Sequence, residues 1–342
     1  MYIAWAKKII EEFSGINLAI LVRAEPTRRT GLKLRRHQRT VAETLVFEGV
    51  ALHSGAHVLL RIHPARVGHG LVFVRSDLEG RPRIAARRLN VIDTSLATTL
   101  GKEFRGQLVS VRTVEHVLSA LYAFGVDNAL LEVTGEEVPV LDGSAGPFVE
   151  ELCRVGLREQ AAPVEHLVIR NEVRVSEGDK WAMVSPSSKL SVRYEVDFDH
   201  PLVSSQPVKL EVCPEQFAKY CARARTFGFK RDVDALRNRG LALGGSLENA
   251  VVIDDYEILN PDGLRFADEF VRHKILDAIG DMALLAKPLI GEVSMSRSGH
   301  ALNARLVDAI LSSESNYEVV VGRESARSLV EGFPLFGSAV RT

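Results

Sequence analysis

Apolar and polar residues alternate regularly only from Thr40 onward. Three segments after this point show the period of two residues, or the short apolar runs, that are typical of β-strands. They are residues 41–50, 57–63 and 71–75, with Gly55 and Pro64 as breaks. The pattern therefore predicts that the folded part of the chain begins with several strands and the turns between them.

A helical period follows the strands. Residues 113–124 place apolar side chains on one face, with Thr113 as the expected cap and Gly125 as the expected stop. A strand is predicted at residues 129–133. A second helix is expected to begin near Pro147, because proline is favoured in the first turn of a helix.

The second half of the chain faintly repeats the first. The matches at a nearly constant offset are Leu45-Val46 with Leu167-Val168, Gly55 with Gly178, and Pro64 with Pro186. Each half also carries a histidine on a predicted helix, His116 in the first and His273 in the second. We therefore predict an α+β fold made of two similar, duplicated α+β units, each with a β-sheet packed on helices. A site is expected at the interface between the units.

The predicted organisation has four parts. Residues 1–36 are basic near their end and lack a strong period, so they are interpreted as a flexible N-terminal extension. The first α+β domain covers 37–160, the second covers 165–325, and 326–342 form a C-terminal tail. The segment REQAAPVE, residues 158–165, has the composition of a linker between the two domains.

Composition narrows the possible functions. The chain has 342 residues, 46% of them hydrophobic, and a formal net charge of −1, so it can bury a large core and has no general reason to bind nucleic acid. Its three cysteines form no Cys-x-x-Cys pair, which fits a reducing compartment and argues against a thiolate metal site. No transmembrane stretch or secretory signal is visible. We expect a cytoplasmic monomer.

The segment RFADEFVRHKILDAIGDMALL, residues 265–285, carries the sharpest chemical pattern. His273 and Asp277 are four residues apart and share one helix face, and Asp281 lies one further turn along it. Such a pair can bind one divalent ion. An isolated pair of this kind is more often a surface ion pair or a satisfied core histidine. Three such groups on one apolar stripe favour a metal site, because buried carboxylates need a partner or a metal.

Three other segments offer further groups, none of them decisive alone. Glu115 precedes His116 at a helix start, where it suits a general base beside a metal, or simply a favourable charge at the helix dipole. His300 lies in a predicted loop and suits a general acid, or is an ordinary surface histidine. The glycine-rich stretch after ARTFGF, residues 224–229, has no phosphate-loop signature, so it identifies no nucleotide.

Taken together, these segments resemble one family, the bacterial UDP-3-O-acyl-N-acetylglucosamine deacetylases of lipid A biosynthesis. The matching stretches run in order from about residue 40 to 310: GVALHSG, TVEH with GVDN, VPVLDGSAGPF, ARTFGF, GLALGGSLENA, FVRHKILDAIGD and SGHALN. The resemblance implies zinc-dependent hydrolysis of an N-acetyl group on a UDP-linked, acylated glucosamine. It does not cover the N-terminal extension.

The resemblance also implies roles for residues in the metal and catalytic site. The implied zinc ligands are His116, His273 and Asp277, with ferrous iron as the alternative ion in the cell. The implied catalytic residues are Glu115 as base, His300 as acid, Asp281 as the partner that orients His300, and Thr226 as a donor to the oxyanion.

Substrate contacts are implied in the same way. Phe227 and Lys274 match positions near the sugar and the diphosphate. The positions that match an apolar passage for the acyl chain are Val233, Ala242, Gly245 and Ser246. One departure lies in DTSLATTL, residues 93–100, where some members have cysteines and this chain has Ala97 and Thr99. We expect no catalytic residue to depend on that loop.

Two other classes of protein use similar groups. A non-haem iron oxygenase also binds its metal with two histidines and a carboxylate, but such a site does not explain the additional glutamate and the separate His–Asp pair. A non-catalytic metal-binding module needs a closed ligand set, and the sequence offers no clear fourth ligand. Acetate release measured against oxygen consumption separates these hypotheses.

Overall fold

The computed structural model describes residues 32, 34–197, 200, 202–203 and 207–322. The elements of the first half, in chain order, are β1 (His37–Val41), β2 (Leu45–Val50), β3 (His57–Pro64), β4 (Leu71–Arg75), β5 (Arg83–Ala85), the 3₁₀ helix η2 (Arg88–Asn90), β6 (Val91–Asp93), β7 (Thr99–Phe104), β8 (Gln107–Val111), α2 (Glu115–Phe124), β9 (Ala129–Val133), α3 (Gly146–Val155) and β10 (Leu157–Pro163).

The elements of the second half are β11 (Glu165–Ile169), β12 (Val173–Glu177), β13 (Lys180–Ser185), β14 (Ser191–Glu195), β15 (Val208–Glu211), α4 (Pro214–Tyr220), β16 (Phe227–Phe229), α5 (Lys230–Asn238), β17 (Val251–Ile253), α6 (Glu269–Met282), the 3₁₀ helix η3 (Ala283–Leu285), β18 (Leu289–Ile290), β19 (Glu292–Ser296), α7 (His300–Leu311), the 3₁₀ helix η4 (Glu314–Asn316) and β20 (Tyr317–Val321).

The two halves contain five-stranded sheets of the same topology. The strand order is β2-β3-β9-β4-β5 in the first sheet and β12-β13-β19-β14-β15 in the second. Each sheet has a single parallel pair at the same place, β4 with β9 and β14 with β19, and its other neighbours are antiparallel. The predicted duplicated α+β fold is therefore confirmed.

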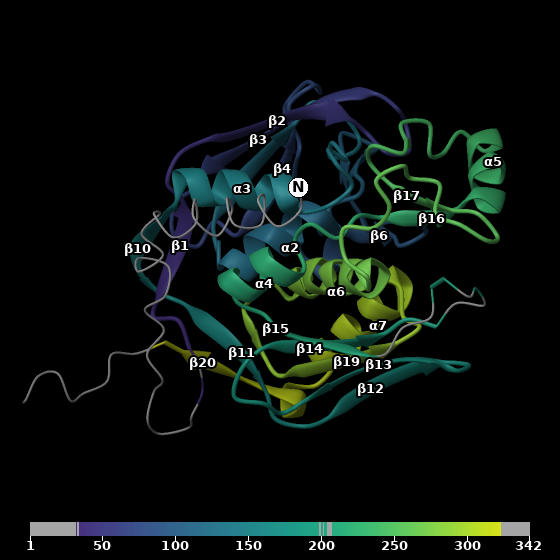
Figure 1. Cartoon of the computed structure of the whole chain (residues 1–342). Helices are drawn as coiled ribbons and strands as arrows, with labels where there is room; N and C mark the ends of the chain where they lie inside the picture. Colours follow the sequence, from purple (N-terminus) through teal and green to yellow (C-terminus); the bar gives the residue numbers. More distant parts are fainter. Residues whose placement is uncertain (1–31, 33, 198–199, 201, 204–206, 323–342) are drawn as a thin grey trace, which may run out of the picture.

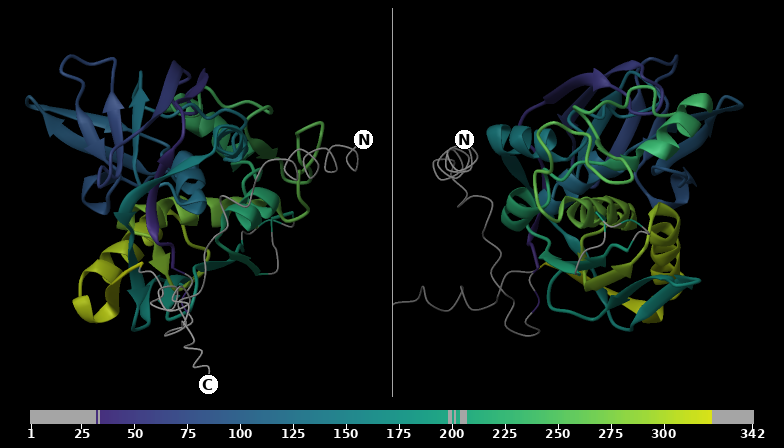
Figure 2. Two further views of the ribbon diagram at one scale, coloured as in Figure 1. Left: turned by 90° about the vertical axis from the view of Figure 1, so that its left-hand side faces the viewer. Right: turned by 45° about the vertical axis from the view of Figure 1, so that its right-hand side comes forward.

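Helices α2 and α6 lie between the two sheets and pack against each other (Figure 1). Their close approach depends on Gly280 of α6, because a Cβ atom at this position would lie 2.2 Å from the backbone oxygen of Glu115. Views from two other directions show the same layers, with the helices in the middle and a sheet on either side (Figure 2). The glycine therefore allows the two histidine-bearing helices to approach closely.

The prediction for the start of α2 was partly wrong. Its helix begins at Glu115, with Val114 as the N-cap residue and no side-chain cap. Thr113 instead has a positive φ of 57°, and its hydroxyl donates a hydrogen bond of 2.7 Å to Glu137. The predicted stop is confirmed, because Gly125 ends the helix in the left-handed conformation.

The sequence match between the halves holds at the first hairpin of each unit but not before it. Gly55 and Gly178 lie in corresponding turns, β2–β3 and β12–β13. The match of Leu45-Val46 to Leu167-Val168 is wrong, because residues 167–168 belong to β11, which pairs with β18 and β20. The strand predicted at 41–50 is also two strands, since β1 pairs with β10 and β2 pairs with β3.

Two predicted boundaries differ from the structure. The prediction of a linker at 158–165 is wrong, since most of these residues lie in β10, which pairs with β1 along an antiparallel ladder. The extension was predicted to run to residue 36, but Leu32 and Leu34 are buried with Val168 and Ile290. The domain limits at 160 and 165 stay predictions.

The segment before β1 is also held by polar contacts. Arg35 forms a two-pronged ion pair with Asp127, and its backbone N–H donates to Nε2 of His166. The rest of the predicted extension, residues 1–31 and 33, and the predicted tail at 326–342 lie outside the described residues. Within the described ranges, no helix combines the length and the apolar character needed to span a membrane.

Candidate metal and catalytic site

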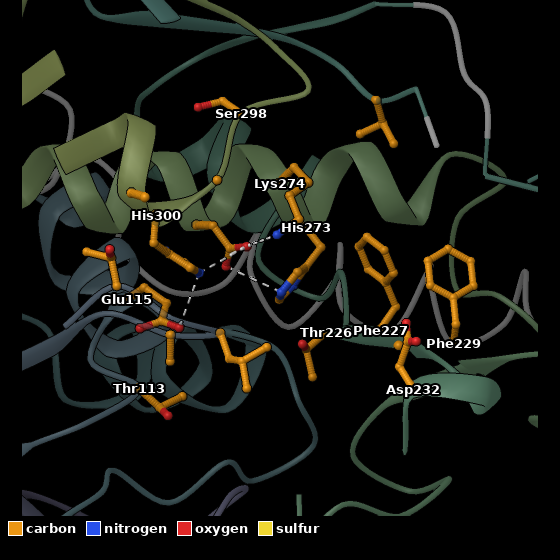
Figure 3. Close-up of a pocket in the computed structure, with 18 of the residues that line it drawn as sticks. Thr113, Glu115, Thr226, Phe227, Phe229, Asp232, His273, Lys274, Ser298 and His300 are labelled. Atoms are coloured by element: carbon orange, nitrogen blue, oxygen red, sulfur yellow. Dashed lines mark hydrogen bonds and ion pairs between the residues drawn. The ribbon is translucent and has the colours of Figure 1, made fainter. Parts of the chain in front are cut away.

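A cavity of about 850 Å³ lies beside α2 and α6, and its wall includes most of the residues that the sequence singled out (Figure 3). These residues are Glu115, His116, Thr226, Phe227, Val233, His273, Lys274, Asp277 and His300. They come from both units of the fold. His300 is the first residue of α7 rather than a loop residue, so that prediction needs correction.

Two imidazoles and one carboxylate converge in this cavity. Nε2 of His273 lies 3.3 Å from Oδ1 of Asp277, and Nε2 of His116 lies 3.8 Å from the same oxygen. All three side chains are buried and could hold one metal ion. The first turn of α2 supplies His116, and one face of α6 supplies the other two, as the spacing of four residues predicted.

The donor atoms fit a cation between them. Nδ1 of His273 lies 3.0 Å from the backbone oxygen of Ala224, so this nitrogen carries the proton and Nε2 presents its lone pair. Burial and then His273 lower the pKa of His116 to about 3, which keeps this imidazole neutral as well. Oδ1 of Asp277 is buried and has no hydrogen-bond partner among the described residues. A divalent ion would satisfy all three acceptors at once.

The neighbours of Asp277 keep its carboxyl group ionised. Burial alone would raise its pKa, but His273 and Lys274 hold that pKa well below its usual range. Nζ of Lys274 lies 2.8 Å from Oδ2, the oxygen that faces away from the two imidazoles. The carboxylate is therefore negative and has one oxygen left for a metal.

A carboxyl group and a cationic imidazole lie next to these groups. Nε2 of His300 lies 3.7 Å from Oε1 of Glu115. Burial raises the pKa of Glu115 to about 7, although the nearby His300 lowers it. Burial lowers the pKa of His300, but the charges of Asp281 and Glu115 outweigh it and raise this pKa to about 9. Both pKa values are raised, and strongly shifted pKa values of this kind cluster at catalytic sites.

Glu115, Asp277 and His300 form a second set of groups that could hold a metal by distance alone. The charge of His300 argues against this alternative, because a protonated imidazole has no lone pair to offer. His116, His273 and Asp277 are therefore the better ligand set.

Asp281 holds His300 in place. Its Oδ2 lies 2.9 Å from Nδ1 of His300 and also accepts a bond of 2.8 Å from the amide of Asn303. Its Oδ1 accepts a bond of 2.6 Å from the hydroxyl of Thr98. Thr98 belongs to the loop at 93–100, so this loop contacts two of the residues for which the resemblance implies catalytic roles.

Thr226 lies at the edge of the cavity on a segment with fixed backbone contacts. Its N–H donates to the oxygen of Gly143, and its own oxygen accepts from the N–H of Val251. Gly143 has a φ of +82°, and a Cβ atom there would lie 1.9 Å from the oxygen of Asn249, so only glycine fits. The hydroxyl of Thr226 faces the same cavity as Glu115 and His273 (Figure 3).

The predicted substrate contacts divide into two groups. Phe227 and Lys274 line the cavity next to each other, with Nζ of the lysine 5.7 Å from the ring centre. Val233 of α5 lines it too. The other residues predicted for the acyl passage, Ala242, Gly245 and Ser246, are not in the wall. Their loop instead packs on the segment that contains Leu52, which does line the cavity.

Sequence reasoning missed several residues of the cavity wall. Lys180 and Arg297 are neighbours at its rim, because Trp181 of β13 pairs with Ser296 of β19. His53 lines the wall as a buried side chain, and its Nδ1 has no partner within the described part of the chain. Only the position of His53 in the stretch GVALHSG pointed to it. Lys180 and Arg297 gave no signal, because their proximity depends on strand pairing across more than a hundred residues.

The buried His-His-Asp set, with a carboxyl group and a cationic histidine beside it, is the arrangement of a metal-dependent hydrolase site. Comparison with known families agrees with this class. The family model for UDP-3-O-acyl N-acetylglycosamine deacetylase matches residues 38–312. The chain belongs to this family, which is one of metalloenzymes.

Curated relatives match over most of their length. The UDP-3-O-acyl-N-acetylglucosamine deacetylase of Myxococcus xanthus (strain DK1622) is 50% identical over 87% of this chain and 93% of its own. Those of Shewanella violacea and Syntrophus aciditrophicus are each 47% identical, over 83% and 82% of this chain and over 92% and 88% of their own.

Proposed function

We propose that this protein hydrolyses the N-acetyl group of UDP-3-O-(3-hydroxyacyl)-N-acetylglucosamine, the committed step of lipid A biosynthesis. The products are acetate and the UDP-linked free amine. The observation that carries the proposal is the convergence of two neutral imidazoles and an ionised carboxylate in the cavity, next to Glu115 and His300. The names of the relatives support the choice of substrate.

His116, His273 and Asp277 are the proposed ligands of a divalent ion, zinc or, in the cell, ferrous iron. When bound, such an ion lowers the pKa of a water that it holds from 15.7 to about 7, which supplies a strong nucleophile near neutral pH. Lys274 and the backbone oxygen of Ala224 orient two of the ligands through their contacts with Asp277 and His273.

Three other residues handle protons and charge. Glu115 accepts a proton from the attacking water, and its pKa of about 7 is close to the value that suits a general base. The hydroxyl of Thr226 donates a hydrogen bond to the oxyanion that forms on the amide carbonyl, a contact typically worth about 2.7–4 kcal/mol. His300, kept cationic by Asp281, gives a proton to the departing amine.

The rest of the cavity suits the substrate. Phe227 provides an apolar face for the sugar ring, while Lys274 and Lys180 provide positive charge for the diphosphate. His53 offers an unsatisfied ring nitrogen to a polar group of the sugar.

Val233 of α5 contributes to the proposed passage for the acyl chain. Ala242, Gly245 and Ser246 are proposed to act indirectly, by holding Leu52 at the wall of the cavity.

The cytoplasmic location, the monomeric state, the absence of a nucleic-acid partner and the division into units at 37–160 and 165–325 remain our predictions. An iron oxygenase is the second candidate, because it uses the same three ligands. It leaves the pair of Glu115 and His300 without a role, and the structure places this pair within 4 Å of each other.

The test is acetate release from the acylated UDP-N-acetylglucosamine, with oxygen consumption followed in parallel. We expect acetate without oxygen uptake, and loss of turnover on chelation that added zinc restores. A substrate without its acyl chain should be processed far less efficiently, since each buried methylene contributes about 0.8 kcal/mol. Oxygen uptake coupled to turnover would favour the oxygenase, and equal efficiency with and without the acyl chain would remove the acyl passage.

A further inference from the structure

The loop between β6 and β7 ends in a threonine that touches the proposed acid and base together. Thr98 is 2% exposed, and the next residue begins β7, whose register with β8 is regular from Leu100 to Phe104. The backbone oxygen of Thr98 accepts from the N–H of Val114, just before α2, at 3.4 Å. The backbone at this position is therefore fixed against the first turn of α2.

The remaining polar atoms of Thr98 contact the residues proposed for catalysis. Its backbone N–H donates a bond of 3.1 Å to Oε2 of Glu115. Its hydroxyl donates a bond of 2.6 Å to Oδ1 of Asp281, and it lies 3.3 Å from Nδ1 of His300. One buried residue thus links the group that accepts a proton with the pair that donates one.

The hydroxyl restrains the carboxylate of Asp281. Oδ2 of Asp281 already serves His300 and Asn303, so Thr98 supplies the donor for the other oxygen. Without that donor, Oδ1 would be a buried acceptor without a partner, and the carboxylate could rotate to find one. Such a rotation would take Oδ2 away from Nδ1 of His300 and change the orientation of the ring.

We infer that Thr98 is a positioning residue for the proposed acid, because its hydroxyl fixes Asp281 and, through it, the ring of His300. The inference rests on the proposed roles of Asp281 and His300. The side chain of Thr98 is not part of the cavity wall, so its effect on the reaction passes through Asp281. A substitution that removes only the hydroxyl leaves the backbone bond to Glu115 intact, which separates the two contacts.

The chain contains a matched control in the next residue. Thr99 is also buried, at 5% exposure, and its hydroxyl has no hydrogen-bond partner in the described part of the structure. Thr98→Val and Thr99→Val make the same change of shape and polarity one residue apart. Only the first removes a hydrogen bond. Thr98→Ser keeps the hydroxyl and tests for rescue.

The experiment compares these three variants in the full chain with zinc bound. We expect Thr98→Val to lower kcat about 10- to 100-fold, the usual cost of losing a residue that orients a catalytic or ligating group. KM and the zinc content should not change. Thr98→Ser should recover most of the kcat, and Thr99→Val should match the unaltered enzyme. Circular dichroism and the thermal midpoint of each variant show whether the fold is retained.

A double-mutant cycle tests the route of the effect. If Thr98 acts through Asp281, adding Thr98→Val to Asp281→Ala should lower kcat little further. The inference is overturned if Thr98→Val has a normal kcat, if Thr99→Val lowers kcat equally, or if the loss persists undiminished in the Asp281→Ala background. His300→Ala separates this result from a failure of the proposed function. A normal turnover of His300→Ala overturns the acid assignment, whereas a low turnover with a normal Thr98→Val overturns only the inference.

Discussion

The two units have the same sheet topology but contribute unequally to the site. Helix α6 of the second unit carries three of the buried titratable groups, His273, Asp277 and Asp281, along its length. Its counterpart α2 in the first unit contributes only through Glu115 and His116 in its first turn. The later helices differ as well, since α7 begins with His300 while α3 begins with Gly146 and no α3 residue lines the cavity.

This difference shows how a repeated scaffold can hold a site that is not repeated. Buried charges are costly unless each one has a partner. The close contact between Gly280 of α6 and the backbone of Glu115 allows α2 and α6 to approach each other at the interface of the two units. The first unit then adds Glu115, the proposed base, and His116, a proposed ligand, to the groups that the second unit already holds.

The largest expected loss of metal binding and turnover follows a substitution in α6. Asp277→Ala should abolish both metal binding and turnover, because it removes the ligand that both imidazoles face. Asp268→Ala is the matched control. Asp268 lies just before the first residue of α6, forms an ion pair with Arg272 of this helix and does not line the cavity. Metal analysis and acetate release check both variants. Retention of a full equivalent of zinc by Asp277→Ala would contradict the ligand assignment.

A smaller effect on activity is expected when Asp281, one turn further along α6, is replaced. The charge of Asp281 raises the pKa of His300, so Asp281→Asn should lower it. His300 acts as an acid only while protonated, and kcat/KM therefore falls as the pH rises through its pKa. The basic limb of the kcat/KM profile should move to lower pH in this variant, with the apparent pKa values belonging to the coupled site. An unchanged basic limb in His300→Ala would show that another group is the acid.

The smallest effect on activity is expected far from the interface, at the start of the chain. A chain truncated to begin at His37 loses Leu32, Leu34 and the pair of Arg35 with Asp127. Each buried leucine contributes about 1.5–3 kcal/mol before the cost of ordering the segment. The thermal midpoint of this shortened chain should drop, while its kcat/KM stays normal at low temperature. A chain that begins at residue 32 should have the thermal midpoint and the kcat/KM of the full chain. An unchanged thermal midpoint would mean that the described contacts add no stability.

The sequence predicted the features that depend on local spacing. The interval of four residues placed His273 and Asp277 on one face of α6, and the turn and strand signals located β4 at its observed bounds. The same kind of reasoning failed at residues 158–165. Their polar composition is typical of a linker, yet they form the strand β10, because β1 offers a partner that lies more than a hundred residues earlier.

Contacts across the fold could not be predicted in the same way. The hydroxyl of Thr98 meets Asp281 across 183 positions of sequence, and no local pattern marks this threonine as different from Thr99. The proximity of Lys180 and Arg297 likewise follows only from the sheet register, in which Trp181 pairs with Ser296. Sequence patterns can therefore suggest which groups do chemistry, while the residues that hold them in place emerge from the packing.

Glu115 is proposed to act as a base beside the metal and not to be one of its ligands. The most direct measurement is the zinc content of Glu115→Gln, taken together with its rate of acetate release. We predict that the variant binds one zinc ion per chain, as the unaltered protein does, and turns over about 10²- to 10⁴-fold more slowly. Loss of zinc to the same extent as in Asp277→Ala would show that Glu115 is a metal ligand and would overturn its proposed role as the base.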